Sequence, residues 1–311
     1  MRGENKPIVV VGSINMDLVT NTARIPSEGE TLTGEDFQTH PGGKGANQAV
    51  AIGRLGYPVR MIGCVGNDAF GQELRASLEN AGVDISAVRI TEGSSGVAVI
   101  LVAKQGENCI IITPGANAHV TPEDIDANLE TIRSAGLVMT QLELPLSTVE
   151  HLAQICANEG IALMLDPAPA RQLPTTLLKR LAWFTPNETE AAFYLGSVDG
   201  GDTHDTDGAA KALIAQGPRA TVLKLGSRGA YVALNKGEAY AVDAYPVNAV
   251  DTTAAGDAFN GAFATGLMMG WPADRSASFA AAAAAISVTR SGAQPSMPSM
   301  QEVEAFMKRA R

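Results

Sequence analysis

The pattern of hydrophobic and polar positions predicts several kinds of element in succession. The chain opens with four apolar residues, Ile8 to Val11, a run typical of a strand buried on both faces. Short apolar and polar stretches then alternate over residues 17–38, broken by one proline and two glycines, which favours an antiparallel hairpin. Residues 96–103 and 108–113 predict a second hairpin, whose turn falls at residues 104–107.

Strands and helices alternate through the rest of the chain. Helices are predicted over residues 45–55 and 70–81, on either side of a strand at 59–62. Beyond Pro122 the predicted strands cover residues 137–139, 161–165, 183–185, 221–225, 230–234 and 239–242, and helices are predicted from 147, over 174–181, from 188, and over 256–269 and 275–290. This alternation predicts an α/β fold with a mainly parallel sheet and helices on both faces.

The two hairpins have no helix to cover them, so they predict a small separate β-sheet that lies over the main domain as a lid. We expect a large α/β domain made of residues 1–16, 41–95 and 114–311, and a lid made of residues 17–40 and 96–113. An uncovered sheet face needs a partner, and a second copy of the same lid is the simplest one. The sequence therefore predicts a homodimer that forms through the lid sheets.

The acidic charge of the chain excludes several classes of function. With a net charge of −10 and no run of Lys or Arg, the chain offers no basic stripe for nucleic acid and no polybasic patch for a membrane surface. The apolar stretch at residues 280–288 is too short to span a bilayer, and the first residues lack the order of a signal peptide. We therefore expect a cytoplasmic protein whose partners are small molecules.

Residues 251–261, DTTAAGDAFNG, lead from a loop into a helix. The small residues Ala254, Ala255 and Gly256 leave the first backbone N–H groups of that helix open to a ligand. The helix dipole adds about half a positive charge at the same point. The motif therefore predicts an anion-binding site built from backbone.

Asp257, just inside this helix, has two interpretations. It is either a helix-starting carboxylate that interacts favourably with the dipole, or a general base aimed at a hydroxyl that attacks a bound phosphate. A carboxylate beside an anion site otherwise only repels the ligand, which favours the base. The dipole predicts a low pKa for Asp257, and phosphoryl transfer tolerates a weak base because the proton leaves late.

A second glycine motif, HPGGKGANQA at residues 40–49, resembles a phosphate-binding loop only superficially. No Ser or Thr follows Lys44, and the G-x-x-x-x-G-K frame of such loops is missing. The strand opening at Val11 likewise lacks G-x-G-x-x-G, which argues against a nicotinamide dehydrogenase.

Together these motifs resemble the ribokinase family of carbohydrate kinases over nearly the whole chain. The matching stretches occur in family order and are GSINMD (12–17), GGKGANQA (42–49), PNETE (186–190), LGSRG (225–229), DTTAAGD (251–257) and AAAAAISVTRSGAQPS (281–296). The resemblance implies a ribokinase-like fold in which the large domain binds nucleotide and substrate.

The resemblance also implies the sugar-binding residues. Asn15 and Asp17 match the sugar-binding pair, and a carboxylate can accept hydrogen bonds from two neighbouring hydroxyls. Gly42 and Gly43 match a lid hinge and sugar contact, and Lys44, Asn47 and Glu143 match further contacts.

On the nucleotide side, Asn187 and Glu190 match an element that organises Mg²⁺ and phosphate through water, although the same residues also form a helix N-terminal capping pattern. The implied contacts to ATP are Lys224, Gly226, Ser227, Gly229, Gly256 and Ala281. Lys224 stands where the family often has threonine, and Ala281 where some members carry a larger polar residue. K⁺ or another monovalent cation is implied near Asp251, Thr253, Ser287, Arg290, Gly292 and Ser296, mostly through backbone carbonyls.

The implied reaction is ATP-dependent phosphorylation of D-ribose at its 5-hydroxyl, with Asp257 as base and residues 254–256 as the anion site. Two alternatives stay open. One is a kinase of the same family for deoxyribose, another sugar or a ribonucleoside. The other is a sugar-sensing protein without catalysis, against which the intact Asp257 argues.

Overall fold

A nine-stranded sheet forms the body of the molecule in the part of the chain that the structure, a computed structural model, describes: residues 6–104, 107–196 and 205–310. The strands lie in the order β13 (Ala239–Val242), β12 (Ala230–Leu234), β11 (Ala220–Lys224), β10 (Trp183–Phe184), β9 (Ala162–Leu165), β8 (Leu137–Thr140), β1 (Ile8–Val11), β4 (Val59–Gly66) and β5 (Asp84–Thr91). From β11 to β5 every neighbouring pair is parallel, and β12 and β13 are antiparallel additions at one edge. The predicted α/β class is confirmed.

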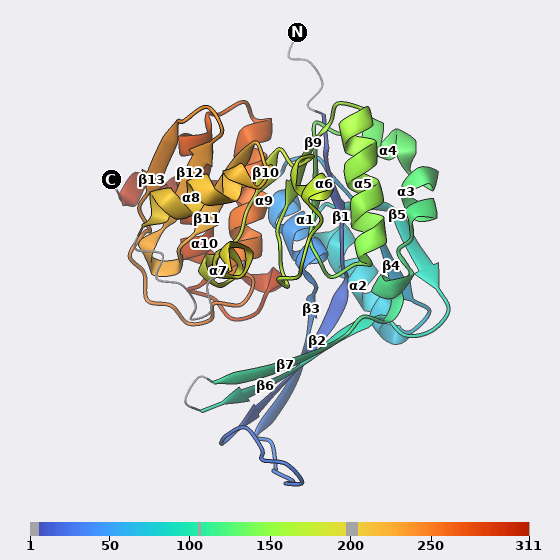
Figure 1. Cartoon of the computed structure of the whole chain (residues 1–311). Coiled ribbons are helices and arrows are strands. Elements are labelled where there is room, and N and C mark those ends of the chain that lie inside the picture. The colour runs from blue at the N-terminus through green and yellow to red at the C-terminus, as the bar shows by residue number, and fades with distance from the viewer. Residues whose placement is uncertain (1–5, 105–106, 197–204, 311) are drawn as a thin grey trace.

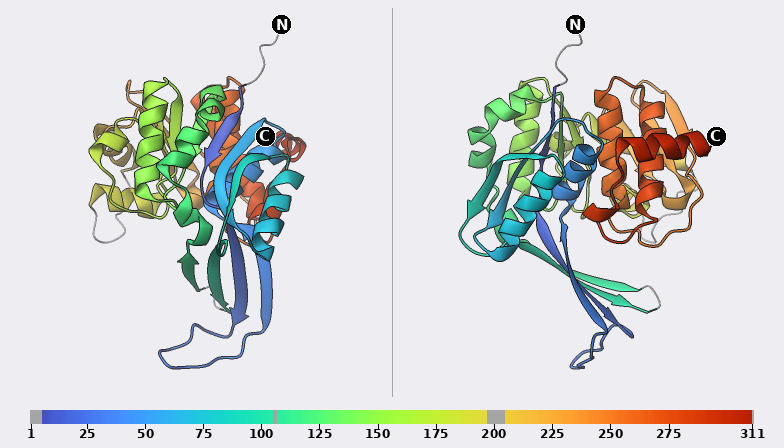
Figure 2. Two further views of the ribbon diagram at one scale, coloured as in Figure 1. Left: turned by 90° about the vertical axis from the view of Figure 1, so that its right-hand side faces the viewer. Right: turned by 180° about the vertical axis from the view of Figure 1, so that it is seen from behind.

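The sheet is buried on both faces because its central strands send alternate side chains to two separate cores. In β1, Ile8 and Val10 belong to one hydrophobic cluster and Val9 and Val11 to the other. The first cluster packs against α1 (Lys44–Arg54), α2 (Ala69–Asn80), α9 (Ala255–Met268), α10 (Ala273–Ser287) and α11 (Met300–Arg309). The second packs against α3 (Pro122–Ala127), α4 (Leu129–Ser134), α5 (Leu146–Asn158), α6 (Thr175–Leu178), α7 (Glu188–Leu195) and α8 (Thr206–Ala215), so the helices form a layer on each face (Figures 1 and 2).

A second sheet projects from the body (Figure 1) and contains, among the described residues, four strands: β3 (Asp36–Gly42), β2 (Asn15–Thr22), β6 (Gly96–Ala103) and β7 (Asn108–Thr113). The predicted hairpins are its two outer pairs, β2 with β3 and β6 with β7, both antiparallel. They join through a parallel pairing of β2 with β6, which no local sequence pattern indicates. The predicted turn at 104–107 includes residues 105 and 106, which lie outside the described residues.

Several elements differ from prediction. The strand β5 was not predicted, because its apolar residues are interspersed with Ser and Arg and it lies at an exposed sheet edge. The helices α3, α4, α8 and α11 were also not predicted. The helix predicted to Arg290 ends at Ser287, because the Val288 carbonyl accepts from the N–H groups of Val250 and Asp251 at 2.7 and 3.1 Å.

The loops that follow the parallel strands converge at one edge of the main sheet. They begin at Gly12 after β1, Gln141 after β8, Asp166 after β9 and Thr185 after β10. In open α/β sheets, ligands bind at this edge, beside the point where the strand order reverses, which here lies between β1 and β8. Within the described residues, no helix is long and apolar enough to cross a membrane.

Candidate active site

Asp257 lies in the first turn of α9, and its side chain is buried. The residue before the helix, Ala254, has φ 58° and is the one non-glycine with positive φ among the described residues. An L-residue in this left-handed region is strained by about 1–2 kcal/mol, and such strain gathers at functional sites. The Ala255 N–H donates to the Thr252 carbonyl at 3.2 Å, so in this conformation one amide of the predicted anion site already has a protein acceptor.

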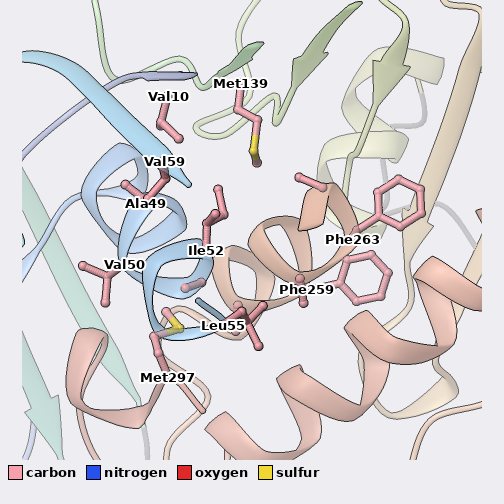
Figure 3. Close-up of a cluster of buried hydrophobic side chains, with 14 of the residues drawn as sticks. Val10, Ala49, Val50, Ile52, Leu55, Val59, Met139, Phe259, Phe263 and Met297 are labelled. Atoms are coloured by element: carbon pink, nitrogen blue, oxygen red, sulfur yellow. The ribbon is translucent and has the colours of Figure 1, made fainter. Parts of the chain in front are cut away.

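Helix α1 supplies the groups that hold Asp257. Asn47 Nδ2 donates to Asp257 Oδ2 at 3.0 Å and Gln48 Nε2 donates to Asp257 Oδ1 at 3.1 Å. The two helices pack through apolar side chains of their buried faces (Figure 3). Gly261, one turn after Asp257, allows this approach, since a Cβ there would lie 2.7 Å from the Ala51 Cβ.

Burial raises the pKa of Asp257 to about 6; Lys44 and the two amide donors lower it, whereas the negative charge of Asp166 adds to the rise. Loss of hydration therefore outweighs the favourable helix terminus. The predicted low pKa is wrong, and the carboxylate is better suited to accept a proton near neutral pH than the helix position alone indicates.

Strand β2 places Asn15 and Asp17 on one face of the second sheet, where both are buried. A Cβ on Gly42 would lie 2.2 Å from Asp17 Oδ2, so glycine is required where β3 passes the carboxylate. Burial raises the pKa of Asp17 to about 7, and the charges of Glu143 and Asp257 add to that rise while Lys44 opposes it. Asn15 Oδ1 accepts from Asn117 Nδ2 at 2.6 Å.

Glu143 follows β8 and faces the start of α1. Its Oε2 accepts from Ser13 Oγ at 2.5 Å and from the backbone N–H of Lys44 at 3.2 Å. Burial lowers the pKa of the Lys44 ammonium, but the carboxylates of Asp257, Asp166, Glu143 and Glu190 raise it more, so it lies above its ordinary value. We refer to Asn15, Asp17, Lys44, Asn47, Glu143 and Asp257 as the polar cluster.

A cavity of about 530 Å³ opens on the other side of the first turn of α9. Six of the eight residues predicted to contact nucleotide line it: Lys224, Gly226, Ser227, Gly229, Gly256 and Ala281. Ala255, predicted as part of the anion site, also lines it. The rest of its wall is mostly apolar or small and was not predicted: Ala244, Tyr245, Pro246, Val247, Ala249, Thr252, Phe259, Ala284, Ala285 and Val288. Asp257 is not among the lining residues, so the polar cluster and the cavity meet at the helix terminus without merging.

Asn187 and Glu190 form the predicted capping box of α7, which confirms their structural role. Both carboxylate oxygens of Glu190 accept from Asn187, from its N–H at 2.8 Å and from its Nδ2 at 3.0 Å. Burial raises the pKa of Glu190, Lys224 lowers it and Asp166 raises it further. Neither residue lines the cavity. Asn187 forms an isolated backbone β-bridge with Lys224, and Lys224 does line the cavity.

The loops predicted to hold a monovalent cation also meet. Asp251 Oδ1 accepts from the N–H of Thr253 at 2.9 Å and Asp251 Oδ2 from the N–H of Gly292 at 2.8 Å. Arg290 turns its guanidinium to Glu302, 2.5 Å away, so only its backbone is left for this site. Ser287 ends α10, and Ser296 lies in the turn at Gln294–Ser296. No cluster of three or more His, Cys, Asp or Glu that could hold a metal occurs within residues 6–104, 107–196 and 205–310.

Five residues that support the site were not predicted. They are Ser13, Gln48, Asn117, Gln141 and Asp166, and all are buried polar side chains. Gln48 lies inside the recognised glycine motif, and Ser13, Gln141 and Asp166 lie one or two residues after strands that were predicted. Position at a strand end could therefore have indicated three of them.

Comparison with known proteins agrees with this arrangement. A family model described as pfkB family carbohydrate kinase matches residues 5–300. The ribokinase of Schizosaccharomyces pombe is 45% identical over 306 residues, which cover 96% of each chain, and the deoxyribokinase of Salmonella typhimurium is 39% identical over 303 residues, 96% of this chain and 98% of that one. The structure of Arabidopsis thaliana ribokinase complexed with ribose and ATP matches with a TM-score of 0.91 at 35% identity and covers 97% of this chain and 99% of the other. The chain therefore belongs to the pfkB family of carbohydrate kinases.

Proposed function

We propose that this chain transfers the γ-phosphoryl group of ATP to the 5-hydroxyl of D-ribose, giving D-ribose 5-phosphate and ADP. The observation that carries the proposal is the position of Asp257 in the first turn of α9, where the polar cluster meets the cavity. The 5-oxygen forms the new bond to phosphorus, its proton passes to Asp257, and the bond between phosphorus and the bridging oxygen of ATP breaks. The N–H groups of Ala254 and Gly256, and that of Ala255 once it leaves the Thr252 carbonyl, stabilise the charge that develops on the phosphoryl oxygens.

The polar cluster favours an uncharged polyol as acceptor. Asp17, Glu143 and Asp257 carry carboxylates close enough to influence one another, which would repel a sugar that already bears phosphate. Asn47 Oδ1 is buried without a protein partner, and a sugar hydroxyl donating to it would satisfy it. Asn15, Lys44 and the backbone at Gly42 and Gly43 supply further contacts to hydroxyls.

The cavity suits a nucleotide, because small residues such as Gly226, Gly229 and Ala281 leave a space of about 530 Å³ beside the helix terminus. Ser227 and Lys224 lie on the same wall. Mg²⁺ would neutralise phosphate charge when bound. The donor set fits such an ion, since Asn187 satisfies one lone pair on each Glu190 oxygen and leaves another on each for a metal-bound water.

K⁺ or a similar cation would be held by the loops of Asp251, Thr253, Ser287, Arg290, Gly292 and Ser296. Their fit rests on Asp251, whose two oxygens tie the loop before α9 to the loop after α10. A cation there would order the loop that leads into the anion site and strengthen the field at the transferring phosphate.

The second sheet would act as a lid and as the dimer interface. Leu18, Val99 and Ile111 are aligned across three strands, so they share the face opposite to Asp17. Val99 and Ile111 are exposed, as is Phe37 on the neighbouring strand. An apolar row of this kind on a protruding sheet supports pairing with a second copy.

The proposal is tested by ADP release from MgATP over a panel of D-ribose, 2-deoxy-D-ribose, fructose and ribonucleosides, each with K⁺ and with Na⁺. We expect the highest kcat/KM with D-ribose. A preference for deoxyribose is the main alternative, since a deoxyribokinase is 39% identical to this chain. No sugar-dependent ADP release would instead support a sugar-sensing protein.

A further inference from the structure

An ion pair between Asp166 and Lys224 lies at the boundary between the polar cluster and the cavity. Lys224 Nζ donates to Asp166 Oδ1 at 2.8 Å, and both side chains are largely buried, 12% and 4% exposed. Lys224 also lines the cavity. A Cβ placed on Gly256 would lie 3.5 Å from Lys224 Nζ. The ammonium group is therefore held beside the first turn of α9.

The same aspartate is linked to the base. Gln48 Nε2 donates to Asp166 Oδ2 at 3.0 Å and to Asp257 Oδ1 at 3.1 Å. Gln48 Oε1 accepts from Gln141 Nε2 at 2.7 Å, which fixes the orientation of the Gln48 amide. A continuous chain of contacts thus joins Lys224, on the cavity wall, to the carboxylate that we propose as base.

The balance of charge around this chain indicates a role for the ammonium. Five carboxylates interact electrostatically with one another or with Lys44 and Lys224. They belong to Asp17, Glu143, Asp166, Glu190 and Asp257. Lys44 lies among them at the start of α1, whereas Lys224 faces the cavity. A triphosphate entering the cavity brings more negative charge, and a preorganised cation at its reacting end would offset the repulsion.

A purely structural role explains less. A buried ion pair costs desolvation and is often replaceable by apolar side chains without loss of stability. Here the pair lies at the wall of a ligand cavity, beside a helix N-terminus and in contact with an amide that holds Asp257.

We propose that Asp166 is a positioning residue that holds the Lys224 ammonium beside the first turn of α9, where Lys224 neutralises charge on the phosphoryl group in transit. This inference rests on the proposed function. In the step, the acceptor oxygen bonds to phosphorus, its proton passes to Asp257, and the electron pair of the broken bond stays on ADP. Lys224 donates to the phosphoryl oxygens throughout the step. Asp166 holds the Lys224 ammonium, and Gln48, which contacts both Asp166 and Asp257, keeps the ammonium and the base in a fixed relative position.

The experiment compares Lys224→Met, Asp166→Asn and the double variant in steady-state kinetics with MgATP and the sugar that the wild type turns over best. We expect Lys224→Met to lower kcat about 100-fold, with the KM for sugar unchanged. Asp166→Asn should lower kcat about tenfold, and the double variant should be no slower than Lys224→Met, because Asp166 acts through Lys224. Lys224→Arg should recover part of the rate. The matched control is Lys211→Met, which breaks an exposed ion pair with Asp207 on α8 and should leave kcat unchanged.

The double variant separates catalysis from structure. Lys224→Met alone leaves a buried, unpaired carboxylate and can lose activity by misfolding, whereas the double variant carries no such charge. If the double variant folds and recovers wild-type kcat, the pair is structural and the inference is wrong; a wild-type kcat in Lys224→Met also overturns it. If the wild type turns over no sugar, the proposed function and the inference fail together.

Asp166→Asn has a second expected effect, on the pH profile. Asp166 raises the pKa of Asp257, whereas Lys44 and the amides of Asn47 and Gln48 lower it. The charge of Asp257 also acts on Asp17. Removing the charge of Asp166 should move the acid limb of kcat/KM for the sugar to lower pH. An unshifted limb would contradict the proposed link between Asp166 and the base.

Discussion

The polar cluster and the cavity lie on opposite sides of one helix terminus and are built in different ways. The cluster consists of polar and charged side chains that are held by hydrogen bonds, either to one another, as Asn47 to Asp257, or to a supporting residue, as Glu143 to Ser13. The cavity is lined mainly by glycine, alanine and other small or apolar residues, with Lys224 as its basic side chain.

This difference follows from what each side has to do. A sugar is recognised by the directions of its hydroxyls, so its site needs fixed donors and acceptors, which bury carboxylates and raise their pKa. A nucleotide base needs mainly space and an apolar wall, and its phosphates need backbone N–H groups. Substitutions in the cluster should therefore change turnover and sugar affinity. Substitutions in the apolar wall of the cavity should change ATP affinity alone, whereas Lys224, on the wall beside the helix terminus, should affect turnover.

The largest effect is expected for Asp257→Asn. Loss of the base should lower kcat about 1,000-fold while the fold and sugar binding remain. Turnover by coupled ADP release, together with calorimetric sugar binding, measures both. Asp274→Asn, at the exposed start of α10, is the matched control and should be fully active. Near-normal turnover of Asp257→Asn would remove this residue from the mechanism.

Asp17→Asn should raise the KM for D-ribose roughly 10- to 100-fold and leave the KM for ATP unchanged, because a charged acceptor for sugar hydroxyls is lost. Steady-state kinetics with each substrate varied in turn tests this. Equal changes in the KM for D-ribose and the KM for ATP would contradict the assignment of sugar binding to the cluster and of ATP binding to the cavity.

The same substitution has a predicted sign in stability. The pKa of Asp17 is raised to about 7 in the folded protein, so the folded state binds this proton more tightly than the unfolded chain. Its ionisation therefore costs stability as pH rises from about 4 to about 7, after which the cost is constant. Asp17→Asn escapes this cost and should be more stable than the wild type above pH 7, on the order of 4 kcal/mol, with little advantage near pH 4. Thermal melts across this range measure the difference, and a constant difference at all pH values would contradict it.

On the cavity side, Ala281→Leu should raise the KM for ATP about tenfold by filling space needed for the nucleotide, with the KM for sugar unaffected. Ala281 lies on the buried wall of the cavity. Ala280→Leu, at a neighbouring buried position that does not line the cavity, tests whether overpacking of α10 alone gives the same result.

The smallest effect on turnover is expected from a change of monovalent cation. Replacing K⁺ by Na⁺ should lower kcat several-fold, and Asp251→Asn should remove that dependence by loosening the two loops that its carboxylate joins. An Asp251→Asn variant with unchanged K⁺ dependence would place the cation elsewhere.

The fold was predictable where one sequence period dominates. Buried strands such as Ile8–Val11 and glycine-marked motifs at residues 42–49 and 251–257 identify themselves locally. The parallel pairing of β2 with β6 was not predictable, because it joins segments about eighty residues apart by tertiary contact alone. The same limit applies to the hydrogen bond between Gln48 and Asp166, which joins two distant elements, and to the pKa of Asp257, which burial sets.

The most direct test of the central claim is the pH dependence of single-turnover sugar phosphorylation in the wild type and in Asp257→Asn. With the pKa of Asp257 raised to about 6, the wild-type rate should fall as pH drops below that value and level off above it. The variant should be slow and lack this acid limb. A variant that keeps the wild-type limb, or its rate, would show that the proton leaves to another group.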